Sequence, residues 1–441
     1  MQKKVSILGA GISGIGAAIL ASKKDYNVFI SDSGSITTKD KRTLDYFNVE
    51  WQENGHAFDK ILSSNIVVKS PGIPNGIEII DRIAEEKIDL ISEIEFASRF
   101  TKAKIIAITG TNGKTTTSLI TYKILKDAGY DVLLAGNIGK SFSLEISQRD
   151  YKYIVLEVSS FQLDNIIDFR PDISIILNIT SDHLDRYKGK ISEYIKSKIR
   201  ITLNQNQHDV LIYNHDDKSV KEIESLAKRI PISLNKRFDL DGCFYFNNKI
   251  NINLNNNTMI IEKLALKGSH NIFNSMAAAM AARVFEVSDD VIRKSLIDFE
   301  NIEHRLEYVL TVHGIDFIND SKATNVNAAW YAIESMNKPF VWIAGGIDKG
   351  NDYSEIIKVL KEKEVRAIVC LGKNNKNIIE AFKGEVEVIE QANNMYEAVN
   401  KSYGLSKIGE SVLLSPACAS FDLFENFEHR GSEFKKMVRS L

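Results

Sequence analysis

The sequence predicts an α/β protein built from parallel sheets that are covered by helices. Short apolar runs alternate with helical patterns along nearly the whole chain, the pattern of parallel α/β layers. The runs are continuously apolar, as expected when helices cover both faces of each sheet. They restart as three series over 441 residues. We therefore expect three domains, at residues 1–96, 97–301 and 302–441.

The predicted strands follow in chain order. The first series comprises Val5–Leu8, Val28–Ile30 and Ile66–Val68. The second series comprises Ile105–Thr109, Val132–Ala135, Tyr153–Val158, Ile173–Ile179 and Val210–Tyr213. The third series comprises Ile315–Ile318, Phe340–Ala344, Ala367–Leu371 and Ser411–Leu414. The segment Cys243–Leu254 alternates instead, and with Asn247-Asn248 as its turn it predicts an antiparallel hairpin at a sheet edge.

The composition is that of an ordinary globular protein. The residues are 44% hydrophobic and 26% charged, with a formal net charge of -2, so there is no reason to expect nucleic acid as a partner. Cys243, Cys370 and Cys418 have neither metal-site spacing nor a disulfide pattern, which favours a reducing compartment. No apolar run approaches the roughly 18–20 residues that cross a bilayer. We expect a cytoplasmic monomer without a membrane partner.

The first strand runs into the glycine-rich sequence Gly9-Ala10-Gly11-Ile12-Ser13-Gly14, and a helical pattern follows. This G-x-G-x-x-G pattern is typical of a diphosphate-binding loop at a helix N-terminus. Asp32, at the end of the second strand, lies where a dinucleotide-binding fold grips a ribose hydroxyl. Alone, the loop leaves a nicotinamide-dependent oxidoreductase open as an interpretation.

A second phosphate loop opens the second series. The strand Ile105–Thr109 leads into Gly110-Thr111-Asn112-Gly113-Lys114-Thr115-Thr116, and a helix follows. Such a turn directs backbone N–H groups at one point, where Lys114 can reach phosphates and Thr115 can hold Mg²⁺. Ile108 stands where the full Walker motif has glycine, so a glycine-rich turn with a surface lysine is the alternative. Two nucleotide-type loops on one chain weaken the oxidoreductase interpretation.

Two further side chains are expected beside this loop, because ligands bind at the carboxyl ends of parallel strands. Glu157 ends an apolar strand, where a carboxylate is costly unless it is paired or bound to metal. His183 follows the strand Ile173–Ile179. A structural ion pair for Glu157 and an ordinary loop histidine for His183 are the alternatives. Their shared position favours metal or phosphate chemistry.

Lys198 is unexpected in its place. On a helix over Ile191–Leu203 it falls inside an apolar stripe, whereas Lys196 and Arg200 point the opposite way. It is either a lysine that extends from the stripe edge to solvent or a semi-buried lysine with a lowered pKa and a reactive neutral amine. The stripe consists of Ile191, Tyr194, Ile195, Ile199 and Ile201.

Polar clusters also follow the strands of the third series. Asn319–Asn325 follows one strand, Gly345–Lys349 the next, and Ser415–Phe427 the last. They predict a site for an anionic substrate, with an N-capped helix as the alternative for the first cluster.

Together these motifs resemble the Mur ligase family of peptidoglycan synthesis, over essentially the whole chain. The matching motifs are G-T-N-G-K-T-T at 110–116, E-V-S-S-F-Q-L-D at 157–164, N-I-T-S-D-H-L-D-R-Y at 178–187, S-H-N-I-F-N at 269–274, E-H-R-L-E at 303–307, N-D-S-K-A-T-N at 319–325 and S-P-A-C-A-S at 415–420. The second and last favour the member that adds D-glutamate. The resemblance implies three domains: a Rossmann-like UDP-binding domain, a central ATPase domain and a Rossmann-like C-terminal domain. It also implies that ATP activates UDP-N-acetylmuramoyl-L-alanine as an acyl phosphate, which the amine of D-glutamate attacks.

The resemblance also implies roles for individual residues. For ATP they are Gly110, Thr111, Asn112, Gly113, Lys114, Thr115, Thr116, Asn274, Arg305 and Asp320, with Asn271 a further candidate. Thr115 and Glu157 would serve one Mg²⁺, and His183 and a carbamylated Lys198 a second, so the implied catalytic residues are Lys114, Glu157, His183 and Lys198. The UDP-substrate residues would be Gly11, Ser13, Asp32, Ser33, Gly72 and Asn137, and the D-glutamate residues Lys322, Thr324, Lys349, Ser420 and Phe427. Gly34 stands where some relatives have a basic residue on the uracil side.

Overall fold

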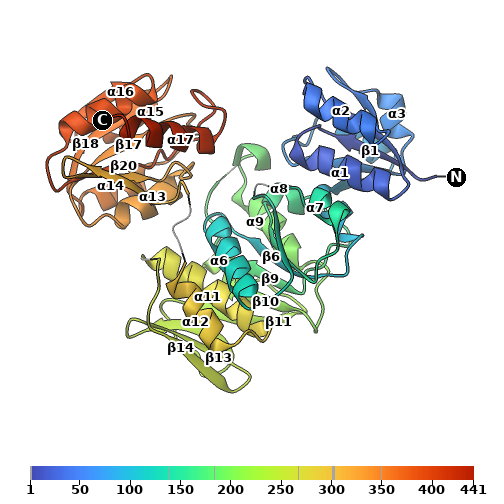
Figure 1. Cartoon of the computed structure of the whole chain (residues 1–441), viewed down its shortest axis with the longest axis horizontal. Helices are drawn as coiled ribbons and strands as arrows, with labels where there is room; N and C mark the ends of the chain where they lie inside the picture. Colours follow the sequence, from blue (N-terminus) through green and yellow to red (C-terminus); the bar gives the residue numbers. More distant parts are fainter. Residues whose placement is uncertain (1, 139, 183, 267, 300–302, 349) are drawn as a thin grey trace. The chain divides into compact units, whose positions relative to one another are not determined.

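The computed structural model describes residues 2–138, 140–182, 184–266, 268–299, 303–348 and 350–441. By its internal contacts the chain forms two compact units, residues 1–265 with 271–299 and residues 266–270 with 300–441. Three sheets organise these units (Figure 1), which confirms the predicted α/β class with its mostly parallel strands. Among the described residues no helix is long and apolar enough to cross a membrane.

The first sheet has five parallel strands in the order β3-β2-β1-β4-β5. Because the order reverses beside β1, the carboxyl ends of β1 and β4 flank the crevice where such sheets bind ligands. The strands are β1 Lys4–Leu8, β2 Asn27–Ser31, β3 Glu50–Gln52, β4 Ile66–Lys69 and β5 Asp89–Ser92. The helices are α1 Ile12–Lys23, α2 Thr38–Tyr46, α3 Phe58–Leu62, α4 Glu78–Glu85 and α5 Glu93–Ser98.

The second sheet has nine strands in the order β14-β13-β12-β11-β10-β9-β6-β8-β7. The central strand β6 lies between β8 and β9, so the loops after these three strands meet at one edge. The strands are β6 Lys104–Thr109, β7 Val132–Gly136, β8 Tyr153–Glu157, β9 Ile173–Ile176, β10 Val210–Asn214, β11 Lys228–Ser233, β12 Gly242–Phe246, β13 Lys249–Leu254 and β14 Asn257–Ile261. The helices are α6 Lys114–Asp127, α7 Phe142–Gln148, α8 Ser160–Leu163, α9 Ile191–Ile199, α10 Lys218–Lys221, α11 Ser269–Val284 and α12 Asp289–Ile297, with 3-10 turns η1 Leu184–Tyr187 and η2 Arg200–Thr202.

The third sheet has six strands in the order β15-β16-β20-β17-β18-β19, with only β15 antiparallel to its neighbour. Apolar cores lie on both of its faces, as the continuous apolar runs predict. The strands are β15 Glu307–Val312, β16 Ile315–Asn319, β17 Phe340–Ala344, β18 Val365–Leu371, β19 Ile389–Ala392 and β20 Ser411–Leu414. The helices are α13 Val326–Glu334, α14 Ser354–Leu360, α15 Lys376–Phe382, α16 Met395–Leu405 and α17 Phe427–Val438.

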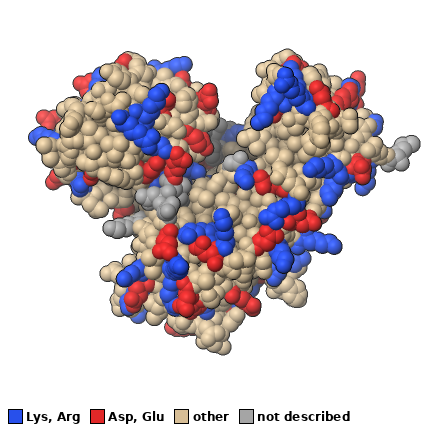
Figure 2. Space-filling model, viewed as in Figure 1, with Lys and Arg blue, Asp and Glu red and all other residues tan. Residues whose placement is uncertain are grey.

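The structure corrects several local predictions. The hairpin β12–β13 turns at Asn247 and Asn248, both with positive φ, but β14 pairs outside it and forms the sheet edge. Strand β9 ends at Ile176, three residues earlier than predicted, and the expected helix Ile191–Leu203 ends at Ile199 before a 3-10 turn. Figure 2 shows cationic and anionic side chains interspersed over the visible surface, in accord with the small net charge.

Candidate active site

The phosphate loop joins β6 to α6. Gly113 caps α6 with φ +84°, and a Cβ there would overlap the Asn274 side chain of α11, so only glycine fits. The side chain of Asn178, from the loop after β9, binds both backbone groups of Asn112. Asn178 Oδ1 accepts from the Asn112 N–H at 2.9 Å, and Asn178 Nδ2 donates to the Asn112 carbonyl at 3.1 Å. The loop therefore sits at the N-terminus of α6, where N–H groups and the helix dipole attract an anion.

Two lysines converge on the first carbonyl of this loop. Lys114 Nζ donates to the carbonyl oxygens of Gly110 and Thr111, at 2.8 Å each. Lys198 Nζ, on α9, donates to the same Gly110 oxygen at 2.8 Å and lies 4.6 Å from the Tyr194 ring centre. Lys198 is 1% exposed, which excludes the alternative of a lysine that reaches solvent. Burial lowers the pKa of Lys198 well below its ordinary value, and the charge of Lys114 lowers it further.

Other residues of this segment also depart from the sequence-based expectation. Ile191 is 37% exposed, so the apolar stripe begins only at Tyr194. Arg200 does not point away, because its guanidinium donates to the carbonyls of Leu163 and Ile166 at 2.8 and 2.7 Å. Tyr194 contacts the phosphate loop, with its hydroxyl 3.2 Å from Thr111 Oγ1. The helical periodicity of the apolar stripe had predicted Tyr194 only as a core residue.

Glu157 ends β8 beside the phosphate loop and is 2% exposed. Its Oε1 accepts a hydrogen bond from Asn137 Nδ2 at 2.9 Å. Its buried Oε2 has no hydrogen-bond partner among the described residues. Such an oxygen is costly unless a cation binds it, so Glu157, with the buried Thr115, fits a Mg²⁺ ion. Asn137, expected at the UDP substrate, thus contacts the candidate metal ligand.

His183, the expected partner of Lys198, lies outside the described residues. Within the described part of the chain there is no cluster of three or more His, Cys, Asp or Glu side chains with metal-site geometry. The hypothesis of a second ion therefore depends on His183 and on carbamylation of Lys198, which would turn a cation into an anionic oxygen ligand.

The glycine loop of the first sheet is closed by Asp32. The Asp32 carboxylate accepts from the N–H groups of Ala10 and Gly34, at 2.7 Å each. Gly14 packs so closely on the Gly9 carbonyl that a Cβ would overlap it. Asp32 therefore fixes the loop, which sequence reasoning did not predict. Of the other residues expected at the UDP-sugar, Gly11, Ser33 and Gly72 are exposed and Ser13 is half-buried.

The third sheet brings together most of the predicted D-glutamate residues that are described. Lys322 Nζ lies 5.0 Å from the Phe427 ring centre, and Ser321 Oγ donates to the Phe427 carbonyl at 2.8 Å. Thr324 follows in the same turn, with its N–H donating to the Lys322 carbonyl. Ser420 is buried and its carbonyl accepts from Phe424. Lys349 lies outside the described residues.

Arg305 and Asp320, both predicted nucleotide contacts, belong to the same unit. The Asp320 carboxylate accepts from Ser415 Oγ at 2.8 Å and from the Leu306 N–H at 3.2 Å. Burial raises the pKa of Asp320 to about 7, and the Ser415 hydrogen bond opposes this rise. Asn274 and Asn271 are buried in the other unit, Asn274 beside Gly113.

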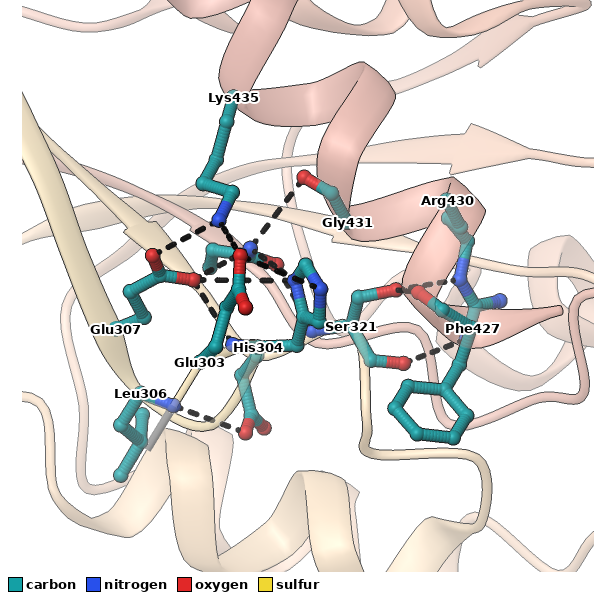
Figure 3. Close-up of polar contacts among 11 residues, drawn as sticks. Glu303, His304, Leu306, Glu307, Ser321, Phe427, Arg430, Gly431 and Lys435 are labelled. Carbon is teal, nitrogen blue, oxygen red and sulfur yellow. Dashed lines mark hydrogen bonds and ion pairs between the residues drawn. The ribbon is translucent and has the colours of Figure 1, made fainter. Parts of the chain in front are cut away.

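Helix α17 contacts the turn formed by residues 303–307 through Lys435 and Gly431 (Figure 3). His304 and Leu306, on either side of Arg305, have φ of +63° and +43°, which is strained for residues other than glycine. Lys435 pairs with Glu303 and, at 3.1 Å, with Glu307, and the His304 ring fills the space that a side chain at Gly431 would need. Contacts from α17 therefore hold a strained turn in place.

Three family models match consecutive parts of the chain. They are the MurD N-terminal domain over residues 4–79, the Mur ligase middle domain over 108–282, and the Mur ligase glutamate ligase domain over 304–418. The chain is 46% identical to UDP-N-acetylmuramoylalanine–D-glutamate ligase of Christiangramia forsetii and 48% identical to that of Bacteroides fragilis, with 100% of each chain covered. The chain belongs to the Mur ligase family.

Solved structures share the fold of this Mur ligase. UDP-N-acetylmuramate-alanine ligase from Thermotoga maritima matches with a TM-score of 0.63 and 16% identity, over 99% of both chains. A MurF ligase from the same organism, in complex with ADP, matches with a TM-score of 0.59 and 15% identity, over 94% of this chain and 95% of that one. At these identities the likeness shows a shared fold and no more.

Proposed function

We propose that this Mur ligase uses ATP to join D-glutamate to UDP-N-acetylmuramoyl-L-alanine during the synthesis of peptidoglycan precursors. The observation that carries the proposal is 46–48% identity over the whole length to relatives named for that activity. The convergence of Lys114, Lys198 and Glu157 on one sheet edge supports it, because phosphoryl transfer needs charge stabilisation at one point.

The reaction has two steps. The terminal carboxylate of UDP-N-acetylmuramoyl-L-alanine attacks the γ-phosphorus of ATP, which forms an acyl phosphate and releases ADP. The neutral amine of D-glutamate then attacks the acyl carbon, phosphate leaves with the bonding electron pair, and the amine gives up a proton as the amide forms. Lys114 and the N–H groups of Asn112–Thr116 would hold the ATP phosphates and stabilise the charge that develops on the transferred group.

Magnesium, when bound, would neutralise phosphate charge and align the reacting oxygens. Thr115 and Glu157 would hold one ion, and His183 with carbamylated Lys198 a second. Lys198 suits this role because its lowered pKa supplies the neutral amine that carbamylation requires.

The remaining predicted residues would bind the other substrate groups. Gly11, Ser13, Asp32, Ser33, Gly72 and Asn137 would bind the UDP-sugar, and Asp32 would act in part by fixing the glycine loop. Lys322, Lys349, Thr324, Ser420 and Phe427 would bind D-glutamate, whose carboxylates match the lysines in charge. Asn274, Arg305 and Asp320 would complete the nucleotide site. We place these functions in three domains, at residues 1–96, 97–301 and 302–441, of a monomer in the cytoplasm.

Measurement of ADP release with UDP-N-acetylmuramoyl-L-alanine, ATP, Mg²⁺ and a panel of amino acids tests the proposal. We expect release with D-glutamate and little with the other amino acids. Preference for L-alanine or another amino acid would indicate a sibling ligase activity, and absence of turnover with all of them would indicate a nucleotide-binding module without catalysis. Tight NAD(P)H binding without ADP release would favour an oxidoreductase, which leaves Gly110–Thr116 unexplained.

A further inference from the structure

Arg186 contacts the loop that follows β4 through three carbonyl oxygens. Its Nη1 donates to Gly72 at 3.2 Å, and its Nη2 donates to Pro71 at 3.2 Å and to Ile73 at 3.0 Å. The guanidinium also lies 4.2 Å from the ring centre of Phe161. A planar guanidinium suits such a set of acceptors, because its donors are fixed in one plane.

A second cation, Lys69, also holds this loop. Lys69, at the end of β4, donates to the Ile73 carbonyl at 3.2 Å and to Asn75 Oδ1 at 2.6 Å. Lys69 is 2% exposed, and burial with the nearby charge of Arg186 lowers its pKa to about 8. The Ile73 carbonyl thus accepts from both cations.

The loop is also joined to the glycine loop of the first sheet. Ser70 Oγ donates to the Gly9 carbonyl at 3.3 Å, and the Ser70 N–H donates to Leu8. A Cβ at Gly9 would approach Ser70 Oγ to 2.9 Å, so the two loops are in close contact. A displacement of Pro71–Ile73 would therefore also shift the glycine loop.

The direction of these hydrogen bonds fixes the exposed Gly72. Because a peptide unit is planar and trans, a Pro71 carbonyl turned toward Arg186 turns the Gly72 N–H the opposite way. A Cβ at Gly72 would meet no atom within 4 Å, so a ligand can approach the backbone there. Arg186 belongs to the segment 178–187, whose Asn178 holds the phosphate loop.

We infer that Arg186 is a positioning residue for the UDP-sugar substrate: it fixes the Pro71–Ile73 backbone, and through it the diphosphate-binding region, against the segment that holds the phosphate loop. This inference rests on the proposed function. Arg186 acts through the Pro71–Ile73 backbone and so determines how the UDP-sugar is presented to the phosphate loop.

Binding and kinetics of Arg186→Ala and Arg186→Lys test the inference. In Arg186→Ala we expect the dissociation constant for UDP-N-acetylmuramoyl-L-alanine, measured calorimetrically without ATP, to rise at least about tenfold, because three charge-assisted hydrogen bonds are lost. The KM values for ATP and D-glutamate should change by less than about twofold. Arg186→Lys should bind with intermediate affinity, because an ammonium group does not reproduce the planar arrangement of donors.

Arg229→Ala is the matched control. Arg229 also donates to a main-chain carbonyl, that of Lys221 at 2.6 Å, and lies 4.6 Å from the Tyr213 ring centre, but neither contact involves the UDP-sugar loops. Its substrate affinities should equal those of the wild type. Guanidinium ions below denaturing concentration should restore part of the UDP-sugar affinity of Arg186→Ala and should not alter that of Arg229→Ala.

Each outcome has a defined meaning. Unchanged UDP-sugar affinity in Arg186→Ala, or an equal loss for all three substrates, would overturn the inference and leave the proposed function intact. A wild-type protein that does not bind the UDP-sugar would overturn both. If Arg186→Ala does not fold, Arg186→Lys is measured in its place. Wild-type affinity of Arg186→Lys for the UDP-sugar, with no change when guanidinium ions are added, would also overturn the inference.

Discussion

The Lys198 ammonium group donates a hydrogen bond of 2.8 Å to the carbonyl oxygen of Gly110, the residue that opens the phosphate loop. Lys114 donates to the same oxygen. Two cations on one carbonyl in a buried site repel each other, and this repulsion adds to the burial that favours a neutral Lys198. The arrangement links the reactivity of Lys198 directly to the loop that is proposed to hold ATP.

Replacement of Lys198 should remove most of the ligase activity. We expect Lys198→Ala to lose at least about a hundredfold in kcat/KM, because the site loses an electrostatic group beside the transferred phosphate. Acetate or formate in the assay should restore part of the activity by replacing the carbamate oxygens. Lys196→Ala is the control, since the Lys196 side chain forms an exposed ion pair with Glu193 and the variant should keep wild-type activity. Equal activities of the two variants would contradict a metal-binding role.

Replacement of Glu157 should weaken metal binding with little effect on folding. Glu157→Gln keeps an oxygen that can accept from Asn137 but loses the carboxylate charge at the buried Oε2, which has no hydrogen-bond partner within the described part of the chain. We expect Mn²⁺ binding with ATP, followed by electron paramagnetic resonance, to weaken at least about tenfold. Glu145→Gln, a change in a carboxylate that contacts Tyr151, serves as the control. Metal affinity that is unchanged in Glu157→Gln would exclude Glu157 as a ligand.

Alanine substitutions at Gly113 and Gly129 should distinguish the effect of backbone strain from that of steric overlap. Both have positive φ, +84° and +79°, but only a Cβ at residue 113 overlaps another residue, Asn274. Gly129→Ala should lower the free energy of unfolding by about 1 kcal/mol through strain alone. Gly113→Ala should cost more and should also abolish ATP binding, as measured by denaturant titration and nucleotide fluorescence. If both variants bind ATP equally well, contact with Asn274 is not required at the phosphate loop.

The helical glycines Gly431 and Gly404 form a second pair. Gly404→Ala has open space and should stabilise the protein by about 0.5–1 kcal/mol, because alanine is the better helix former. Gly431→Ala should destabilise it, because the new methyl group would displace the His304 ring from α17. The KM for ATP should rise in that variant alone, since His304 precedes Arg305. Stabilisation by Gly431→Ala would show that the His304 ring can take another position without loss of stability.

Asp320 should make stability depend on pH. Its pKa is about 7 in the folded protein and about 3.9 in an unfolded chain, so the folded state binds more protons between these values. Its contribution to the free energy of unfolding is therefore fully present below pH 4 and is lost as the pH rises to 7. The whole change is about 4 kcal/mol at 1.36 kcal/mol per pKa unit. Urea titrations at several pH values should show this slope in the wild type and not in Asp320→Asn; equal slopes would place the titration elsewhere.

Local sequence patterns were sufficient to predict the strands that position the candidate site. Continuous apolar runs located the strands whose carboxyl ends carry Gly110, Glu157 and Asp320, because burial on both faces leaves that pattern in the sequence. The position of Lys198 followed from helical periodicity, which also depends only on residues nearby. Strands without a long continuous buried run were missed, namely β3, β5, β11, β14, β15 and β19.

The contacts between distant segments were decided by the tertiary structure. Arg186 and Pro71 lie 115 residues apart, Asn112 and Asn178 lie 66 apart, and nothing in either partner's sequence neighbourhood indicates the other. The burial of Lys198 was also left open by the sequence. Periodicity places a side chain on one face of a helix but does not show which other segments pack over that face. Apolar runs in the amino-acid sequence were enough to locate the strands that carry Gly110, Glu157 and Asp320, although β9 ends three residues earlier than predicted. Only the packing of those strands, with β6 between β8 and β9, determined which of these residues meet, because hydrogen bonds and desolvation depend on neighbours in space.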